Sequence, residues 1–199
     1  MKKSIMIIAA LMIVVLLLIC NFAYAGQWRF PVGVAYSTGF YKMTNVVEDN
    51  LHAMGYSVEK KSQWPVGLTF QPYYEFDNGL GIGGGFGPFM YLKAESPSES
   101  YSLYAMPVNL SLRYAFLPSS NISPYIRSGI SYHIAGGDFV KSKEVGFLVG
   151  IGTEFFRKKK VGFGFEFAVD TSSVNMTKYY NSDKKVRPSE FLISIFAVF

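Results

Sequence analysis

The sequence predicts an all-β fold: an eight-stranded antiparallel up-and-down transmembrane β-barrel preceded by a cleavable signal peptide. Three observations lead to this prediction. The mean hydropathy is +0.20, and only 17% of the 199 residues are charged. The longest apolar run lies at the N-terminus, and eight later segments alternate bulky apolar residues with small or polar ones.

The composition excludes several classes of protein. Half of the residues are hydrophobic, which excludes a disordered chain, and a single cysteine excludes a disulfide scaffold or a cysteine-based zinc cluster. The net charge of +5 is spread along the chain, unlike the concentrated basic face of a nucleic-acid-binding protein. The length suits one domain.

The N-terminal segment, residues 1–25, has the three parts of a secretory signal peptide. Lys2 and Lys3 precede an apolar stretch over residues 5–20, and the small-x-small triplet Ala23-Tyr24-Ala25 follows. We therefore expect cleavage after residue 25, which leaves residues 26–199 as the barrel domain. The alternatives are an uncleaved anchor helix and lipidation at Cys20, although Ile19 stands where a small residue normally precedes an acylated cysteine.

The first strand is predicted over residues 27–41, where even positions are bulky and odd positions are small or polar. The bulky set is Trp28, Phe30, Val32, Val34, Tyr36 and Phe40. The second strand is predicted over residues 64–76, with Trp64, Val66, Leu68, Phe70, Tyr74 and Phe76 on one face. A period of two sustained over some fifteen residues is long for a strand of a soluble sheet.

The turn Asp77-Asn78-Gly79 is a strong hairpin signal and leads into the third strand. There Leu80, Ile82, Phe86, Met90 and Leu92 oppose a face of glycines. The remaining strands are predicted over residues 103–116, 125–134, 144–155, 161–170 and 190–199. The last is the least regular, because Leu192, Phe196 and Val198 occupy its otherwise polar side.

The predicted connectors alternate in length. The longer ones are residues 42–63, 94–102, 135–143 and 172–189, and the shorter ones are residues 77–79, 117–124 and 157–160. An even-stranded membrane barrel places long loops outside the cell and short turns in the periplasm, whereas a soluble sandwich has no reason for this alternation.

The size of the side chains predicts which face points outward. Eight strands leave room only for side chains in the lumen, so the bulky face must point to lipid and the small or charged face inward. Aromatic residues lie near both ends of the outward face, as expected at the two membrane interfaces. They are Trp28, Tyr74, Phe76, Tyr114, Phe116 and Phe155 toward the short turns, and Phe40, Trp64, Tyr104 and Tyr132 toward the long loops.

Six charged residues fall on the predicted lumen face near the periplasmic end: Arg29, Glu75, Arg113, Arg127, Glu154 and Glu166. An unpaired charge in so narrow an interior costs several kcal/mol, so we expect a hydrogen-bonded network of arginines and carboxylates. This network is expected to close the lower lumen. The alternative is an ion-pair gate that opens.

Together these features resemble the small eight-stranded outer-membrane barrels of Gram-negative bacteria, the OmpA, OmpX and OmpW-like group within the porin family. In that family a C-terminal aromatic residue, here Phe199, signals to the barrel-assembly machinery, although Ala197 stands where a larger residue is common. The resemblance implies an outer-membrane location. It also implies that outer-membrane lipids, lipopolysaccharide and the assembly machinery are partners of a monomeric chain, with no nucleic acid.

Two further features have a chemical and a structural interpretation. Ser131, His133 and Glu144 suggest acyl hydrolysis, as in lipid A-modifying barrels, but these residues are predicted to point into the lumen, where ordinary polar side chains also belong. Residues 79–84 match G-x-G-x-x-G without the strand-to-helix context of a phosphate loop. Their glycines are expected to make room in the lumen.

A short amphipathic helix is predicted in the first long loop. Asn45 and Glu48 resemble a capping box, Val47, Leu51 and Met54 share one face, and Gly55 suits the C-terminal cap. The helix is expected either to cover the mouth or to lie on the membrane, with His52 solvated. The basic loop residues are either solvated or in contact with lipopolysaccharide phosphates: Lys60, Lys61, Lys178, Lys184, Lys185 and Arg187.

The functional prediction is a structural or surface-interaction protein of the bacterial envelope with a lumen filled by side chains. We expect no catalytic residue, cofactor or metal site. The alternative is a narrow conduit for small hydrophobic molecules, for which an apolar pocket in the wall or upper lumen would be the discriminating feature. A lipid A-modifying enzyme is the more remote alternative.

Overall fold

The computed structural model describes residues 26–58, 60–97, 99–178 and 181–199. The predicted signal peptide and its alternatives, an anchor helix and lipidation at Cys20, lie outside the described residues. Among those residues, no helix is both long and apolar enough to span a membrane.

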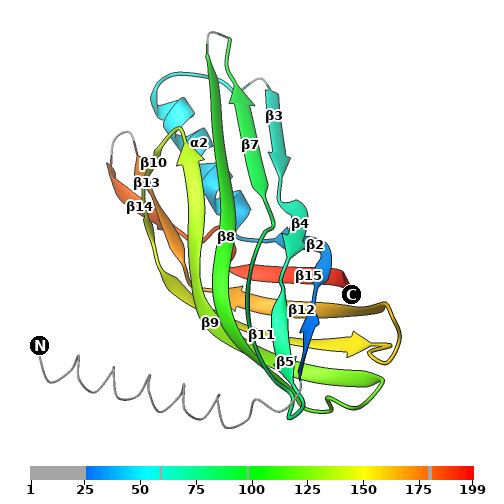
Figure 1. The fold of residues 1–199 in the computed structure, drawn as a ribbon. Helices are drawn as coiled ribbons and strands as arrows, with labels where there is room; N and C mark the ends of the chain where they lie inside the picture. The colour runs from blue at the N-terminus through cyan, green and yellow to red at the C-terminus, as the bar shows by residue number, and fades with distance from the viewer. Residues whose placement is uncertain (1–25, 59, 98, 179–180) are drawn as a thin grey trace, which may run out of the picture.

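The described chain is built mainly of antiparallel strands (Figure 1). The strands are β1 (Gly26–Arg29), β2 (Pro31–Ser37), β3 (Lys60–Trp64), β4 (Val66–Phe70), β5 (Tyr73–Phe76), β6 (Leu80–Phe86), β7 (Met90–Glu95), β8 (Ser100–Ala115), β9 (Ile122–Gly137), β10 (Val140–Glu144), β11 (Gly146–Phe155), β12 (Gly162–Asp170), β13 (Ser173–Lys178), β14 (Asn181–Val186) and β15 (Phe191–Val198). The helix α2 spans Phe40–Ala53.

These strands close into a barrel whose wall has eight long strands. Ladders run from β2 through β4, β6, β8, β9, β11, β12 and β15, and β15 pairs again with β2. Several of these wall strands are interrupted and carry two or three labels. The first consists of β1 and β2, and the second consists of β3, β4 and β5. The predicted eight-stranded antiparallel barrel is therefore confirmed.

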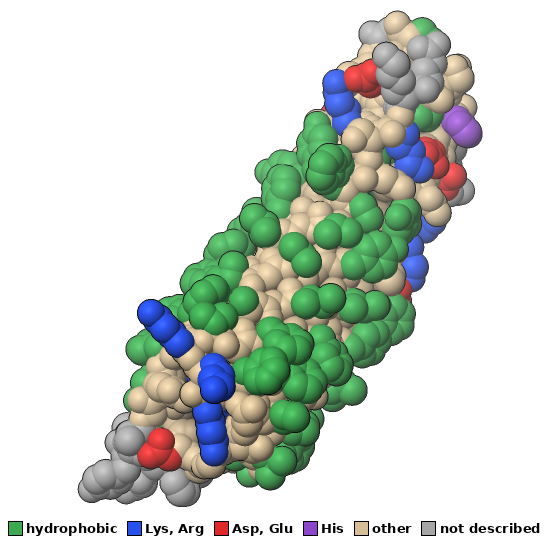
Figure 2. Space-filling view, turned by 90° about the vertical axis from the view of Figure 1, so that its right-hand side faces the viewer, with side chains coloured by type: hydrophobic (Ala, Val, Ile, Leu, Met, Phe, Trp, Pro, Cys, Tyr) green, Lys and Arg blue, Asp and Glu red, His purple; other side chains and the backbone are tan. Residues whose placement is uncertain are grey.

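The outer wall of the lower barrel is apolar, as predicted. Its large side chains are exposed, for example Leu68 and Phe147 at 70% each, while the alternate positions are buried. Figure 2 shows the hydrophobic side chains as a broad band across the face in view, with charged side chains toward both ends. Since water does not favour such a surface, this band is the part of the wall that faces lipid.

The strands extend farther beyond this band than the alternation predicted. All four predicted long connectors are partly strand: β3 begins at residue 60, β7 and β8 are joined only by residues 96–99, and β9 and β10 by residues 138–139. The predicted connector 172–189 contains β13 and β14, which form a separate three-stranded sheet with β10. The upper barrel is thus made of two facing sheets.

Three outward assignments were wrong. Phe40 begins α2 instead of ending the first strand, and it is fully buried. Met90 and Leu92 also point inward, with exposures of 0% and 1%. The third wall strand is interrupted between Phe86, where β6 ends, and Met90, where β7 begins. This interruption shifts the alternation by one position, so β7 turns its odd positions outward.

The helix α2 fills the space between the two upper sheets (Figure 1). It begins five residues earlier than the predicted start at Asn45, and Gly39 rather than Asn45 is its N-cap. Its C-terminal end is as predicted: Met54 is the C-cap, and Gly55 has a positive φ of 84°. The helix covers the mouth, and His52 on its outer face is exposed.

Candidate functional site: a lumen filled in three layers

The lowest layer of the lumen is a network of arginines, carboxylates and tyrosines. All six predicted charged residues are buried, with exposures from 1% to 9%. Arg113 Nη1 donates to Glu154 Oε1 at 2.6 Å, and the Tyr73 hydroxyl donates to the same oxygen at 2.7 Å. A second set joins Arg127 and Tyr125 to Glu166.

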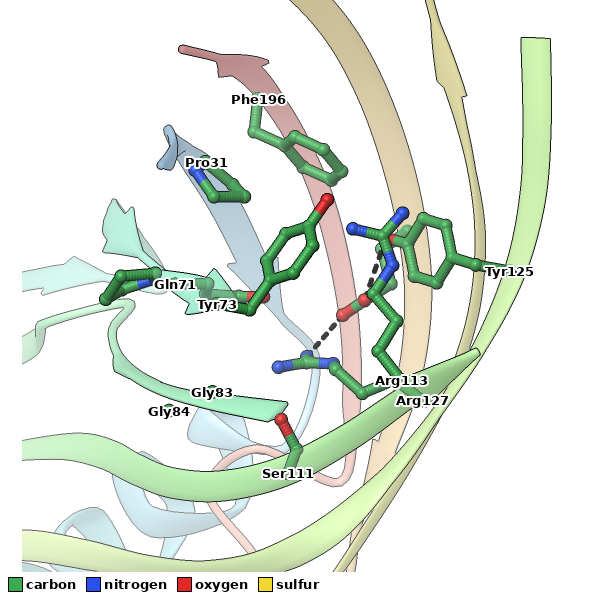
Figure 3. Close-up of a pocket in the computed structure, with 12 residues that line it drawn as sticks. Pro31, Gln71, Tyr73, Gly83, Gly84, Ser111, Arg113, Tyr125, Arg127 and Phe196 are labelled. Atoms are coloured by element: carbon green, nitrogen blue, oxygen red, sulfur yellow. Dashed lines mark hydrogen bonds and ion pairs between the residues drawn. The ribbon is translucent and has the colours of Figure 1, made fainter. Parts of the chain in front are cut away.

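The rings of Tyr73 and Tyr125 also contact Arg113. The guanidinium carbon of Arg113 lies 3.6 Å from the ring centroid of Tyr125 and 4.4 Å from that of Tyr73. Figure 3 shows these side chains converging from different strands, together with Arg127. The cavity left between them has a volume of about 20 Å³. That is room for about one water molecule and not for a solute.

Arg157 is a member of this network that the alternation did not reveal. It is bonded to Glu75, and its Nη1 lies 3.5 Å from Glu154 Oε2. In the sequence it stands at the start of a basic turn, where a solvated side chain is expected. The preceding residue, Phe156, has a positive φ of 57°, and this break in the strand conformation brings Arg157 to the inside.

With Arg157 included, the network contains four arginines and three carboxylates. Arg29 Nη1 donates to the main-chain oxygen of Arg157 at 3.4 Å, and no carboxylate of the described residues lies within 4.0 Å of the Arg29 guanidinium. The excess positive charge therefore lies at the periplasmic end of the lumen.

The glycine run in β6 makes room for this network and is not a phosphate-binding loop. A Cβ on Gly83 would lie 2.3 Å from the oxygen of Pro72 and 2.5 Å from the Cβ of Tyr73. Only glycine permits the backbone of β6 to approach β5 this closely. The predicted role of these glycines is consistent with the fold.

The middle layer is a chain of hydroxyl groups around His133. His133 Nδ1 lies 2.8 Å from Ser172 Oγ, and His133 Nε2 lies 2.9 Å from Ser189 Oγ. Ser172 and Ser131 both donate to Asp170, at 2.7 and 2.6 Å. His133, Ser172 and Ser189 are fully buried.

The carboxylate of this chain is Asp170, and the grouping of His133 with Glu144 was wrong. Glu144 is bonded by Ser173, Asn175 and Lys185 on the half-exposed three-stranded sheet. A hydroxyl also stands between His133 and Asp170, whereas a catalytic triad needs the carboxylate on the imidazole itself. The layer satisfies buried polar groups and gives no attacking oxygen access to lipid.

The upper layer is apolar and is made by α2. Side chains of the helix pack against the inward faces of β7, β8 and β9 and against β13 and β14. Its fully or nearly fully buried apolar residues are Phe40, Met43, Val46, Val47 and Leu51. Polar contacts fix the helix at its edges: Asn50 Nδ2 donates to the Thr177 oxygen at 2.7 Å, and Lys61 pairs with Glu48 at 2.6 Å.

Comparison with known proteins explains this architecture. The sequence model described as "Outer membrane protein beta-barrel domain" matches residues 10–199. The chain belongs to this family of outer-membrane β-barrels. Accordingly it is a protein of the outer membrane, and the apolar band is the surface that contacts its lipids. No curated protein sequence matches the chain significantly.

Two solved outer-membrane proteins are similar to this chain. OprG from Pseudomonas aeruginosa is 12% identical and superposes with a TM-score of 0.56, over 87% of this chain and 95% of OprG. Outer membrane protein W of E. coli is 16% identical, with a TM-score of 0.49 over 89% and 98% of the two chains. The likeness to OprG shows a shared fold and, at this identity, no shared ligand.

The last strand of this outer-membrane β-barrel has the pattern predicted for an assembly signal. Phe199 is 57% exposed on the outer wall, and its amide and carbonyl pair with those of Phe30. Phe191, Ile193 and Ile195 are exposed on the same side. Recognition of Phe199 by the assembly machinery stays a prediction.

Proposed function

We propose that this protein is a closed barrel with a structural or surface-interaction role in the bacterial envelope. The observation that supports this most directly is the filled lumen. An ion-paired layer, a hydroxyl and imidazole layer and a helix lie one above another, and the cavity in the lowest layer holds about one water molecule. Interactions would then take place at the surface above the membrane.

A planar-bilayer recording tests the closed lumen. The mature protein, refolded in detergent and added to the bilayer, should give no stable conductance. A large, stable conductance would show that the layers open and would favour the ion-pair gate. Heat-modifiable migration on an unboiled gel serves as the control that the added protein is folded.

A second candidate, a narrow conduit for small hydrophobic molecules, has one observation in its favour. Between β4 and β6 the wall is joined by a single residue pair, Phe70 with Phe86. Beside this interruption lies an apolar groove of about 460 Å³ on the outer wall, lined by Trp64, Val66, Gly67, Leu68, Phe89 and Tyr91. Uptake of an apolar dye into proteoliposomes, above that of protein-free liposomes, would support the conduit.

We also propose that the protein is not an enzyme and needs no cofactor. Support comes from the burial of His133 and from the hydroxyl between it and Asp170. The substitution His133→Ala should leave the acylation pattern of lipid A unchanged in a mass spectrum. A changed pattern would support the lipid A-modifying alternative.

Lipopolysaccharide is a proposed partner of the upper surface, with solvation of the basic side chains as the alternative. Lys184 and Arg187 are exposed there, whereas Lys61 and Lys185 pair with Glu48 and Glu144. Binding to the unpaired side chains would be electrostatic, so added salt should weaken it. We propose a monomer, with lipids and the assembly machinery as its other partners and no nucleic acid.

A further inference from the structure

The periplasmic end of the barrel contains a recess with an unusual lining. It has a volume of about 790 Å³ and lies between the turn at residues 118–120, the turn at residues 157–160 and strand β1. Its lining includes five cationic side chains and no acidic side chain: Arg29, Arg157, Lys158, Lys159 and Lys160.

The lysines of this recess have no anionic partner in the described structure. Lys158, Lys159 and Lys160 are exposed, and none of them forms an ion pair with a described residue. Arg29 lies next to them with no carboxylate within 4.0 Å, and the network behind it has four arginines for three carboxylates. An anion in the recess would therefore offset an excess of positive charge.

Part of the lining of the recess is apolar. Trp28 and Phe199 line it, with exposures of 59% and 57%, and Trp28 stacks on Phe30 with 6.1 Å between the ring centroids. Phe156 and Val161, which flank the basic turn, are 49% and 46% exposed on the outer wall. Because these side chains belong to the lipid-facing band, the lysines are held at the level of the phospholipid headgroups. Figure 2 shows Lys or Arg side chains directly beyond the hydrophobic band at the turn end.

We infer that this recess binds an anionic phospholipid of the periplasmic leaflet, of the phosphatidylglycerol type. The phosphate lies against Lys158, Lys159 and Lys160, next to Arg29, and the acyl chains run along Trp28 and Phe199. Lysine binds phosphate as a point charge, so the site selects net negative charge rather than one headgroup geometry. The inference rests on the outer-membrane location and not on the closed lumen.

The test compares lipid binding by the full mature barrel and two charge-matched variants. Native mass spectrometry of the refolded protein should show preferential retention of phosphatidylglycerol over phosphatidylethanolamine. In the triple variant Lys158→Ser, Lys159→Ser, Lys160→Ser, the affinity for phosphatidylglycerol should fall about tenfold or more, because each lysine near a membrane surface contributes to attraction. The control is Lys93→Ser, Lys141→Ser, Lys143→Ser at the other end, which should retain the preference.

Three outcomes would overturn the inference: equal retention of the two lipids, an equal loss in both triple variants, or displacement of the lipid by inorganic phosphate at low millimolar concentration. The last would mean that the apolar side contributes nothing and that the recess is a site for soluble phosphate. Heat-modifiable migration shows that both variants fold. Conductance measured on the same variants keeps the lipid site and the closed lumen distinguishable, because loss of the lysines should leave the barrel closed.

Discussion

At the scale of single residues, Glu154 is the centre of the lower layer. It is 1% exposed, accepts hydrogen bonds from Arg113 and Tyr73, and lies within ion-pair distance of Arg157. Two cationic side chains that are buried around one carboxylate depend on it, because neither has access to water.

The substitution Glu154→Gln should therefore lower the free energy of unfolding by about 3–5 kcal/mol, the usual cost of removing one partner of a buried ion pair. Gln keeps the size and one acceptor but removes the charge. Urea unfolding in lipid vesicles, followed by tryptophan fluorescence, measures the change. The matched control is Glu144→Gln on the half-exposed upper sheet, which should shift the midpoint little. Equal effects of the two substitutions would contradict the network.

Arg157 shows why part of this layer could not be predicted. Alternation predicts which face a side chain is on only while the chain stays in the strand conformation. The positive φ of Phe156 interrupts that conformation, so the alternation does not predict the direction of the next side chain, Arg157. The other six charged members lie within regular strands or at their ends, and the pattern placed all six inside. Position in a turn gives no such information, because a turn side chain can point either way.

At the scale of elements, the helix α2 closes the mouth by packing. Leu51 is fully buried in the upper core, whereas the next residue, His52, is exposed on the other side of the helix. The substitution Leu51→Ala should reduce the hydrogen-exchange protection of the helix by about 2–5 kcal/mol, as for other large-to-small changes in a core. His52→Ala should leave the protection unchanged. Similar exchange in the two variants would indicate that the helix is not held by this core.

The three-stranded sheet of β10, β13 and β14 contains a second testable contact. Hydrogen bonds from Lys185 and then Asn175 hold the pKa of the Glu144 carboxyl below its ordinary value. A carboxyl with a lowered folded pKa stabilises the sheet above its unfolded pKa, and this contribution is lost as the pH falls through the folded pKa.

We expect Lys185→Met to raise the pKa of Glu144 toward its ordinary value of about 4.3. Lys143→Met, at an exposed neighbour that forms no ion pair with Glu144, should leave that pKa unchanged. An NMR titration of the side-chain carboxyl carbon, in detergent micelles, measures both. A Glu144 pKa that is ordinary in the unsubstituted protein would contradict the contact.

The upper strands also explain which elements the sequence could not place. In β7 and β13 the apolar residues point inward, against α2, while polar residues such as Lys93 and Asn175 lie on the other face. In the lipid-facing band the apolar residues point outward. Periodicity shows that faces alternate but not which one is outside, so strands above the band were predicted as long loops or given the wrong face. The level at which the apolar residues change from the outer to the inner face marks where the wall leaves the bilayer.

At the scale of the whole molecule, the barrel has a polar lower interior and an apolar exterior, which is the inverse of a soluble barrel. Its stability therefore depends on the bilayer as solvent for the outer wall. The alternation of side-chain size was enough to predict this orientation, because the lumen of an eight-stranded barrel holds a few rings, such as Tyr73 and Tyr125, but not the whole bulky face. Phe163, Phe165 and Phe167 on that face are all exposed.

This orientation predicts that a charge on the outer wall destabilises the barrel in proportion to its depth in the membrane. Ile195 lies midway along β15 and is 61% exposed, whereas Ile122 begins β9 next to a short turn and is 48% exposed. Ile195→Lys should lower the free energy of unfolding in vesicles by about 2–4 kcal/mol, and Ile122→Lys by about 0–1 kcal/mol, because the second lysine reaches the headgroups. The two substitutions add the same group at similar exposure, so their difference reports depth alone. In detergent micelles, where the apolar layer is thinner and adaptable, the difference should shrink; equal costs in vesicles would mean that the apolar band does not span the bilayer.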